Sequence, residues 1–409
     1  MKIFQINLTS GHGSTGRIVK DLASVISSNN GEVFVGYGFF QDNSLNSYKT
    51  VKSKSVLGVK LSLMRTRVTG YHGYTNRHKT EILTEKIREF EPDVIHLHNI
   101  HGGFINIETL FNFLSKYKKP IIWTLHDCWT FTGHCAYFSY IGCEKWKTGC
   151  EKCPQLKSYP KSYFFDRSKY QWNSRKNLFT NEGLDITLVT PSNWLSSIVK
   201  ESYMSKYPVH VINNGIDLDT FKPIRPNNYV KNPIFDNRKI VLAVASSWSE
   251  RKGLRFINEV AELLSNDYQL IVVGVTTKQK NELNPKIYGI ERTNNVSELV
   301  EYYNIANVFI NPTLEDNFPT TNIEALACGT PVISFNTGGS IEAIDNSTGI
   351  ILKENNEVEL FNAIVKVCEN DKNHYREKCR ERAIALYNKN DRYQEYFDLY
   401  KTLIKNSDQ

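Results

Sequence analysis

Two carboxylates, Asp316 and Glu324, lie eight positions apart around the predicted start of a helix, with Phe318–Thr321 between them. A helix start offers unpaired N–H groups and the positive end of the helix dipole, which suit a phosphate. Carboxylates would compete with a phosphate, so they are better placed to accept hydrogen bonds from sugar hydroxyls. Phosphate and hydroxyl recognition in one place is typical of a nucleotide-sugar site. The segment also fits a capping box, Thr321-Asn-Ile-Glu324, in which Glu324 only satisfies a backbone N–H.

Two adjacent cations, Arg251 and Lys252, follow the first predicted strand of the second half of the chain. On a loop that faces a binding cleft they could neutralise the charge that a pyrophosphate gains as its sugar departs. The alternative is a solvated surface pair without a ligand. Arg292, just before another predicted helix, offers further donors for a nucleotide base or ribose.

A glycine-rich turn, Gly11-x-Gly13-x-x-Gly16, joins the first predicted strand to a helix. This spacing fits a dinucleotide fingerprint, which also requires an acidic residue at the end of the second strand to bind ribose. No acidic residue closes that strand, so an NAD-dependent dehydrogenase is disfavoured. A tight loop remains that could lie against a phosphate or an acceptor, or could be a plain turn.

Histidines gather at two other predicted strand ends. His126 and Asp127 follow one strand, and His98, Asn99 and His101 follow another. The carboxyl ends of parallel strands share one edge of a sheet, where ligands bind. These side chains could therefore contact an acceptor, although buried structural histidines would show the same pattern.

Four cysteines, Cys135, Cys143, Cys150 and Cys153, fall within one short irregular segment. Their number and the Cys-x-x-Cys spacing of the last two fit a structural zinc site that staples a long loop. Free reduced thiols and a redox pair remain alternatives, and Cys128 is left over.

The composition indicates a soluble protein of two domains. The chain has 409 residues, of which 40% are hydrophobic and 23% charged, and this length exceeds one ordinary core. The first residues resemble no signal peptide, and no apolar run could span a bilayer, so we expect a cytoplasmic protein.

The net charge of +7 is concentrated between Lys49 and Lys79, where eight cations interleave with apolar residues and no acidic residue occurs. This basic stretch could lie on an anionic membrane surface or receive an anionic acceptor, or be merely solvated. Nucleic acid is not an expected partner, because no binding motif accompanies the charge.

Short apolar strands alternate with helical patterns along both halves, which predicts parallel, doubly wound sheets in two Rossmann-like domains that face each other across a cleft. The predicted domains are residues 1–210, with a Cys-rich insert at about 128–160 and a C-terminal helix at 386–409, and residues 211–385. The predicted strands are Lys2–Asn7, Glu32–Gly36, Asp93–His98, Ile121–Leu125, Ile186–Thr190, Ile240–Ala245, Leu270–Gly274, Val308–Asn311 and Val332–Phe335.

These motifs together resemble the GT-B glycosyltransferases of family GT4, retaining enzymes of bacterial polysaccharide assembly, over nearly the full length. The resemblance rests most on the linker Asn214-Gly-Ile-Asp217 and on the run from Glu324 to Val332. The Cys-rich insert is similar to one in a subgroup linked to capsule or colanic-acid-like synthesis. The resemblance implies sugar transfer from a nucleotide-sugar donor to a lipid-linked or oligosaccharide acceptor, without a metal for the chemistry.

The resemblance also implies roles for individual residues. Lys252 would bind the pyrophosphate, His126 would contact the sugar, and Asp316 would sit near the transferred sugar. The donor-binding set would be Gly13, Gly16, Arg251, Lys252, Arg292, Asn317, Phe318, Pro319, Thr320, Thr321 and Glu324. The family has Glu at the position of Asp316, Gly at that of Asn317 and Arg at that of Ser247, and Glu315 is one position out of register. A nucleotide-sugar epimerase and a non-catalytic sugar-nucleotide binder on the same fold remain alternatives.

Overall fold

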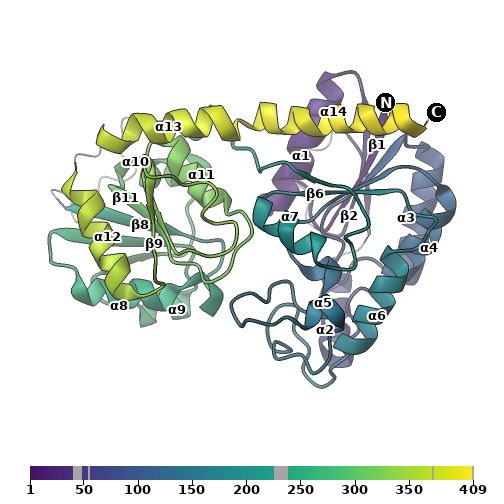
Figure 1. Cartoon of the computed structure of the whole chain (residues 1–409), viewed down its shortest axis with the longest axis horizontal. Helices are drawn as coiled ribbons and strands as arrows, with labels where there is room; N and C mark the ends of the chain where they lie inside the picture. Colours follow the sequence, from purple (N-terminus) through teal and green to yellow (C-terminus); the bar gives the residue numbers. More distant parts are fainter. Residues whose placement is uncertain (40–47, 54–55, 225–237, 371–372, 408–409) are drawn as a thin grey trace. The chain divides into compact units, whose positions relative to one another are not determined.

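The computed structural model describes residues 1–39, 48–53, 56–224, 238–370 and 373–407 (Figure 1). The chain divides into two compact units. The first contains Met1–Asn213 together with Arg392–Gln409, and the second contains Asn214–Asp391. The boundaries therefore fall at Asn213 rather than 210 and at Arg392 rather than 386.

The first unit is built on a parallel sheet of seven strands in the order β3-β2-β1-β4-β5-β6-β7. Residues of its central strands are almost all buried, because helices or other segments cover both faces of a parallel sheet. Its strands are β1 (Lys2–Asn7), β2 (Glu32–Tyr37), β3 (Lys49–Lys52), β4 (Val94–Leu97), β5 (Ile121–Thr124), β6 (Ile186–Thr190) and β7 (Val209–Val211).

Helices connect these strands, and two apolar clusters form the core of the unit. One cluster joins strand residues to α1 and to the aromatic face of the C-terminal helix α14, which contributes Tyr393, Tyr396, Phe397 and Tyr400. The helices are α1 (Gly13–Ser28), α2 (Val56–Thr69), α3 (Arg77–Phe90), α4 (Ile107–Tyr117), α5 (Lys145–Thr148), α6 (Ser168–Phe179), α7 (Asn193–Lys200) and α14 (Lys389–Ser407). Within the predicted insert, residues 128–160, regular structure is limited to the short helices η2 (Trp129–Phe131) and α5.

The second unit is also built on a parallel sheet, which has six strands in the order β10-β9-β8-β11-β12-β13. Its strands are β8 (Lys239–Val244), β9 (Tyr268–Val273), β10 (Ile287–Ile290), β11 (Val308–Asn311), β12 (Val332–Ser334) and β13 (Gly349–Ile351). Its helices are α8 (Leu254–Leu263), α9 (Thr277–Glu282), α10 (Val296–Ile305), α11 (Thr320–Ala327), α12 (Glu357–Glu369) and α13 (Asn373–Tyr387), with a short η5 at Glu250–Lys252.

The strand order reverses once in each sheet, between β1 and β4 and between β8 and β11. The loops that leave such a neighbouring pair of strands run in opposite directions, which opens a crevice at their carboxyl ends. In the first unit these loops carry Gly11–Gly16 and His98–His101. In the second unit they carry Arg251–Lys252 and Asp316. The topology therefore places these four segments at the carboxyl ends of the strands that flank the two switch points.

All nine predicted strands are present to within about two residues, and the doubly wound fold class is confirmed. The prediction missed β3, β7, β10 and β13, each of which has three or four residues and lies at or near a sheet edge. These strands are short and bury less than the central ones, so their hydrophobic pattern is weak.

The long C-terminal helical stretch is interrupted at Asn388. Ile216 forms a parallel bridge there, donating its N–H to Tyr387 O at 2.7 Å and accepting from Lys389 N–H at 3.1 Å. Gly215 permits this approach, because a Cβ at that position would lie 2.4 Å from Lys389 Cα. The stretch is therefore two helices, α13 and α14, instead of one.

Candidate functional site

Two loops of the second unit, one after β8 and one after β11, are joined at the switch point of its sheet. Gly253 has a φ of +77°, and a Cβ there would lie 2.0 Å from the carbonyl oxygen of Pro312. Leu314 donates its backbone N–H to Arg251 O at 2.8 Å, which ties the loops together. Only glycine satisfies both the backbone conformation and the close approach at position 253. The join fixes Arg251 and Lys252 beside the loop that carries Asp316.

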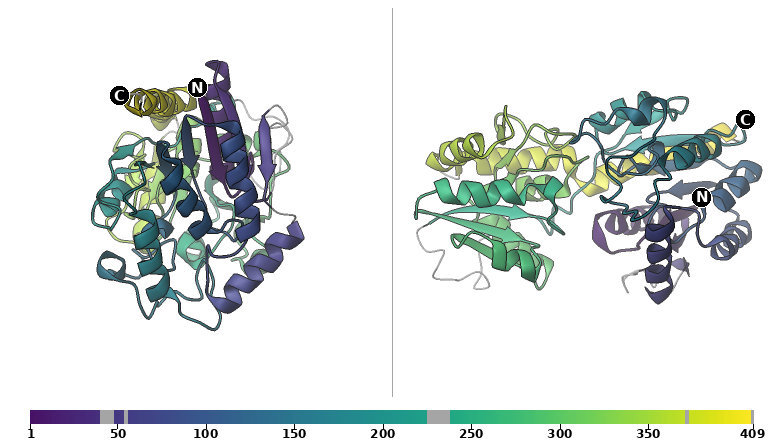
Figure 2. Two further views of the ribbon diagram at one scale, coloured as in Figure 1. Left: turned by 90° about the vertical axis from the view of Figure 1, so that its right-hand side faces the viewer. Right: turned by 90° about the horizontal axis from the view of Figure 1, so that it is seen from below.

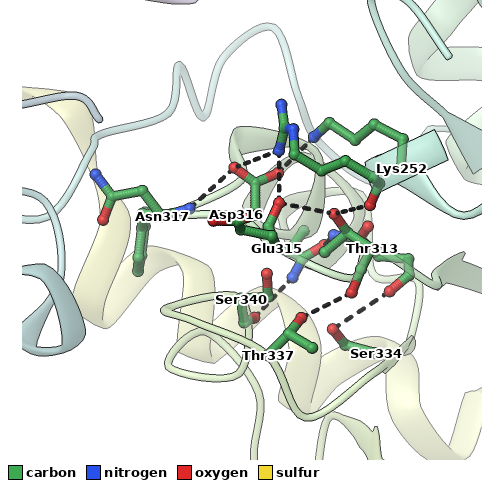
Figure 3. A network of polar contacts seen from close by, with 12 residues as sticks. Lys252, Thr313, Glu315, Asp316, Asn317, Ser334, Thr337 and Ser340 are labelled. Atoms are coloured by element: carbon green, nitrogen blue, oxygen red, sulfur yellow. Dashed lines mark hydrogen bonds and ion pairs between the residues drawn. The ribbon is translucent and has the colours of Figure 1, made fainter. Parts of the chain in front are cut away.

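Lys252 and Asp316 form an ion pair at this junction (Figure 3). Arg251 supports it from the same loop, with its Nη1 4.0 Å from Asp316 Oδ1 and 2.5 Å from the Glu315 carbonyl oxygen. Burial alone would raise the pKa of Asp316, but the neighbouring Lys252 and Arg251 hold that pKa below its usual value. Asp316 is therefore ionised at neutral pH and sits between two cations.

A third loop, after β12, supports the backbone of Asp316. Gly338 has a φ of +55°, and a Cβ there would lie 2.0 Å from Asp316 O. Gly339 donates its N–H to the same oxygen at 3.2 Å, and Thr337 Oγ1 donates to Thr313 O at 2.7 Å (Figure 3). No motif predicted this support, although adjacent glycines just after a predicted strand were a signal for it.

Helix α11 begins at Thr320, with Pro319 as its N-cap residue and no side-chain cap. Thr321 therefore lies inside the helix, and the capping-box prediction is wrong. Glu324 is 4% exposed, and its Oε2 accepts a hydrogen bond from the hydroxyl of Tyr303 at 2.8 Å. Tyr303, which no motif indicated, thus anchors the second carboxylate of the predicted pair.

The remaining donor-site candidates are distributed more widely. Asn317 and Phe318 are buried, and Asn317 donates its backbone N–H to Asp316 Oδ1 at 3.0 Å. Arg292 is exposed on the loop after β10, at the sheet edge and two strands away from β8. Gly13 and Gly16 belong to the first unit, where Gly16 closes the loop by accepting the N–H of Gly11 at 2.9 Å.

The first unit brings its predicted histidines together at the ends of β4 and β5. His98 Nδ1 lies 3.3 Å from His126 Nε2, and His101 Nε2 lies 2.9 Å from Asp127 Oδ2. Asn99 donates its backbone N–H to Asn7 Oδ1 at 3.1 Å. A small cavity is lined by His98, Asn99, His101, His126 and Asp127 among other residues. The five candidates therefore form one polar cluster.

One contact to this cluster comes from the Cys-rich insert, and no sequence motif indicated it. The hydroxyl of Tyr159 lies 3.0 Å from His101 Nδ1, on the far side of the ring from Asp127. The insert therefore helps to orient the imidazole that faces Asp127.

Charges in the cluster are set by burial. Loss of water lowers the pKa of His126 to about 4 and that of His98 well below its usual value. Burial opposes ionisation of Asp127, but the adjacent His101 brings the pKa of Asp127 below its ordinary value. Near neutral pH the cluster thus combines neutral His98 and His126 with an ionised Asp127.

The buried histidines predict a loss of stability in mild acid. His96 and His98 are 0% and 1% exposed, and burial lowers the pKa of each well below its usual value. Below about pH 6.5 these histidines bind protons in the unfolded chain but stay unprotonated in the folded chain. The free energy of unfolding should therefore decrease as the pH is lowered, by up to about 1.4 kcal/mol per pH unit for each such histidine.

Urea denaturation between pH 7.5 and pH 5.5 measures this effect. His98→Gln should reduce the pH slope, whereas His78→Gln should not, since the side chain of His78 is 81% exposed. An unchanged slope in His98→Gln would contradict the assignment.

The four cysteines of the predicted zinc set line one small space in the insert, together with His134. In the described part of the chain, no three histidine, cysteine or acidic side chains already converge closely enough to hold a metal ion. The zinc prediction therefore remains a prediction at this stage.

Two doubly wound parallel units, one with paired cations and a buried carboxylate at its switch point, define an α/β protein with a charged site at the carboxyl ends of its second sheet. Residues 16–220 match the family model for Glycosyltransferase Family 4, and residues 238–370 match that for glycosyl transferases group 1. The chain belongs to Glycosyltransferase Family 4.

Curated relatives include WcaC of Escherichia coli (strain K12), named as a colanic acid biosynthesis glycosyl transferase. It is 28% identical over 277 residues, which cover 66% of each chain. A Campylobacter jejuni N,N'-diacetylbacillosaminyl-diphospho-undecaprenol alpha-1,3-N-acetylgalactosaminyltransferase is 29% identical over 47% of this chain and 54% of its own length. The matches thus span between about half and two thirds of these relatives, and none of the names points to an epimerase.

Solved structures share the fold over the full length. Sucrose-phosphate synthase from Thermosynechococcus elongatus superimposes with a TM-score of 0.74 at 18% identity, covering 99% of both chains. Anabaena Alr3699/HepE in complex with UDP superimposes with a TM-score of 0.69 at 14% identity, covering 98% of this chain and 100% of that one. The predicted GT-B architecture is confirmed at the level of fold.

Proposed function

We propose that this protein transfers a sugar, with retention of configuration, from a nucleotide-sugar donor to a lipid-linked or oligosaccharide acceptor in cell-surface polysaccharide synthesis. The observation that carries the proposal is the charged junction of Arg251, Lys252 and Asp316 at the switch point of the second sheet. The names of two relatives support it. The Campylobacter jejuni relative is named for a diphospho-undecaprenol acceptor. An Escherichia coli relative, 25% identical over 51% of this chain and 58% of its own length, is named UDP-Gal:alpha-D-GlcNAc-diphosphoundecaprenol alpha-1,3-galactosyltransferase.

In this proposal the diphosphate of the donor binds against Lys252 and the start of α11. Lys252 is held in place by Asp316 and remains partly accessible, with 22% of its side chain exposed. Its charge, with that of Arg251, would stabilise the diphosphate as the bond to the sugar breaks. The two side chains, rather than a metal ion, would supply the positive charge needed at that step.

Two carboxylates would divide the recognition of sugar hydroxyls. Glu324, anchored by Tyr303, would accept hydrogen bonds from the ribose, and Asp316 would face the transferred sugar. Backbone N–H groups of Phe318, Thr320 and Thr321 would serve the phosphates and the sugar. No nucleophilic side chain is assigned, so the rate would depend on positioning and on stabilisation of the leaving group.

The acceptor would use the polar cluster of the first unit. Neutral His98 and His126, with ionised Asp127, offer both donors and acceptors for sugar hydroxyls. His126 would contact the transferred sugar, as the family resemblance implies.

A donor screen tests the proposal. We expect one family of nucleotides, among UDP, GDP and others, to raise the melting temperature, and the matching nucleotide sugar to be consumed slowly by hydrolysis and faster with acceptor. Retention predicts that the anomeric configuration seen by NMR is the same in product and donor. Binding without turnover by any acceptor would instead indicate a non-catalytic binder, and an acceptor-free isomerised sugar would indicate an epimerase.

We infer that the protein meets its lipid-linked acceptor at the cytoplasmic face of the membrane through α2, the helix of the basic stretch 49–79. Figure 2 shows α2, in indigo, at the edge of the first unit. Four apolar residues, Leu57, Leu61, Met64 and Val68, follow its exposed side at helical spacing and are 40–66% exposed. Exposed cations flank them at Lys60, Arg65 and Arg67. An apolar stripe bordered by cations suits an anionic lipid surface.

In the described residues, no helix could span a bilayer.

Flotation with vesicles that contain anionic lipid measures this contact. The double variant Leu61→Glu/Met64→Glu should lower the bound fraction by at least about tenfold, since it places carboxylates in the apolar stripe. Leu263→Glu is the matched control, because Leu263 is a 46% exposed helical leucine of the second unit. Equal binding by wild type and the double variant would exclude α2 as the contact.

A further inference from the structure

The Cys-rich insert concentrates its cysteines around one small buried space. Cys135, Cys143, Cys150 and Cys153 all line it, as does Trp146. Cys135 is 7% exposed, and the other three are partly buried. Only η2 and α5 give this segment regular structure, so hydrogen bonds of helices and sheets do little to hold it.

The sulfur atoms already interact with one another and with backbone N–H groups. Cys135 and Cys153 are hydrogen-bonded through their side chains. Gly133 donates its N–H to Cys150 Sγ at 3.2 Å, and Cys153 receives a backbone hydrogen bond from Gln155. Lys152, between the last two cysteines, has a φ of +47°, which tightens the turn. Backbone donors directed at sulfur stabilise a negatively charged thiolate.

Buried positive charge next to the cysteines points the same way. Arg175 is fully buried, lies 3.8 Å above the ring of Trp129, and donates to the carbonyls of Trp129 and Thr132 and to the amide oxygen of Gln171. None of these three hydrogen-bond acceptors carries a charge. A buried charge without a counter-charge is costly. Arg175 lies within electrostatic reach of Cys135 and Cys150, whose thiolates would supply that counter-charge.

A buried histidine gives a further, independent indication. His134 is 1% exposed and lines the same space, and its Nε2 has no hydrogen-bond partner within the described structure. An unpartnered buried polar atom beside the four sulfurs indicates that this space is incomplete without a further group.

We propose that Cys135, Cys143, Cys150 and Cys153 bind one Zn²⁺ as four thiolates, which closes the insert around the metal. The step is redox-neutral: four S–H protons leave to solvent and four sulfur–zinc bonds form. The site would carry two negative charges, one of which Arg175 balances. Closure would bring the four sulfurs, which share the lining without yet converging, to tetrahedral positions. The zinc would be structural, holding the insert from which Tyr159 reaches His101.

Metal analysis of the full chain, purified without chelator, tests the proposal. We expect about one zinc per chain, and loss of that zinc in Cys150→Ser and Cys153→Ser. Cys368→Ser, at a buried cysteine of the second unit, is the matched control and should retain it. An equal zinc content in the wild type and in the insert variants would indicate an adventitious ion only, and would overturn the proposal. So would metal-free protein whose thiols alkylate freely, or a mass that shows disulfides.

Wild-type protein provides a second readout if the variants do not fold. Removing zinc with a chelator should expose four thiols to alkylation and lower the melting temperature. Adding Co²⁺ should then produce the absorption of tetrahedral thiolate coordination. Failure of Co²⁺ to give that spectrum would count against four-sulfur ligation. None of these outcomes depends on sugar transfer, so they test the site independently of the proposed function.

Discussion

Lys252→Ala is expected to lower the kcat of sugar transfer by at least about 100-fold, the effect typical of removing one group that stabilises charge in a transition state. The position of Lys252 is fixed twice, by its ion pair with Asp316 and by the close contact of Gly253 with Pro312. The charge on the diphosphate grows as the sugar departs, so the loss should appear mainly in kcat. Initial rates with the identified donor and acceptor measure it.

Two variants control for this substitution. Lys252→Arg keeps the charge but changes the donor geometry, so we expect an intermediate rate. Lys278→Ala removes a lysine whose side chain is 83% exposed on α9 of the same unit, and it should leave the rate near that of wild type. A Lys252→Ala rate within about threefold of wild type would remove Lys252 from the mechanism.

Glu324→Ala is expected to weaken nucleotide binding by about 10- to 100-fold, corresponding to about 1.5–3 kcal/mol for hydrogen bonds to a charged group. Glu324 is almost fully buried in α11 and is oriented by the hydroxyl of Tyr303 at 2.8 Å. Its carboxylate is therefore preorganised for ribose hydroxyls. Calorimetric titration of the nucleotide found in the donor screen measures the loss.

A substitution of Tyr303 distinguishes nucleotide binding by Glu324 from the support that Tyr303 gives to Glu324. Tyr303→Phe removes the hydrogen bond and keeps the carboxylate, so its effect on nucleotide affinity should be smaller than that of Glu324→Ala. Both variants should lower the melting temperature, since each leaves a buried polar group without its partner. Unchanged nucleotide affinity in Glu324→Ala would show that this carboxylate serves only the packing of α11.

The parts of the fold that short-range sequence patterns specify could be predicted. Central strands such as Ile186–Thr190 are continuous apolar runs, because both faces of a parallel sheet are covered. Edge strands such as β3 and β13 could not, since their short sequences are only partly buried. The break between α13 and α14 was also hidden. It depends on Ile216, whose bridge to Asn388 spans a long separation in sequence.

The residues of the site also divide into those that the sequence indicated and those that it did not. Asp316, Glu324 and Lys252 stood out because of their residue types and their positions after predicted strands. Their partners did not. Lys252 meets Asp316 across 64 positions, Glu324 meets Tyr303 across 21, and Tyr159 meets His101 across 58. Glu315 is 2% exposed and accepts a hydrogen bond from Arg251 through its backbone carbonyl, whereas Asp316 pairs with Lys252 through its carboxylate.

Local patterns in the sequence were sufficient to predict the alternation of strands and helices, and hence the doubly wound class and the strand ends that carry polar residues. Those properties follow from hydrophobic period and turn chemistry, which act over a few residues. The tertiary structure decided which strand ends became neighbours, through the reversals of strand order at β1/β4 and β8/β11. It also decided that the helix-capping reading of Thr321 fails, because α11 starts at Thr320 after Pro319. Such outcomes depend on the packing of the whole core, which no local pattern contains.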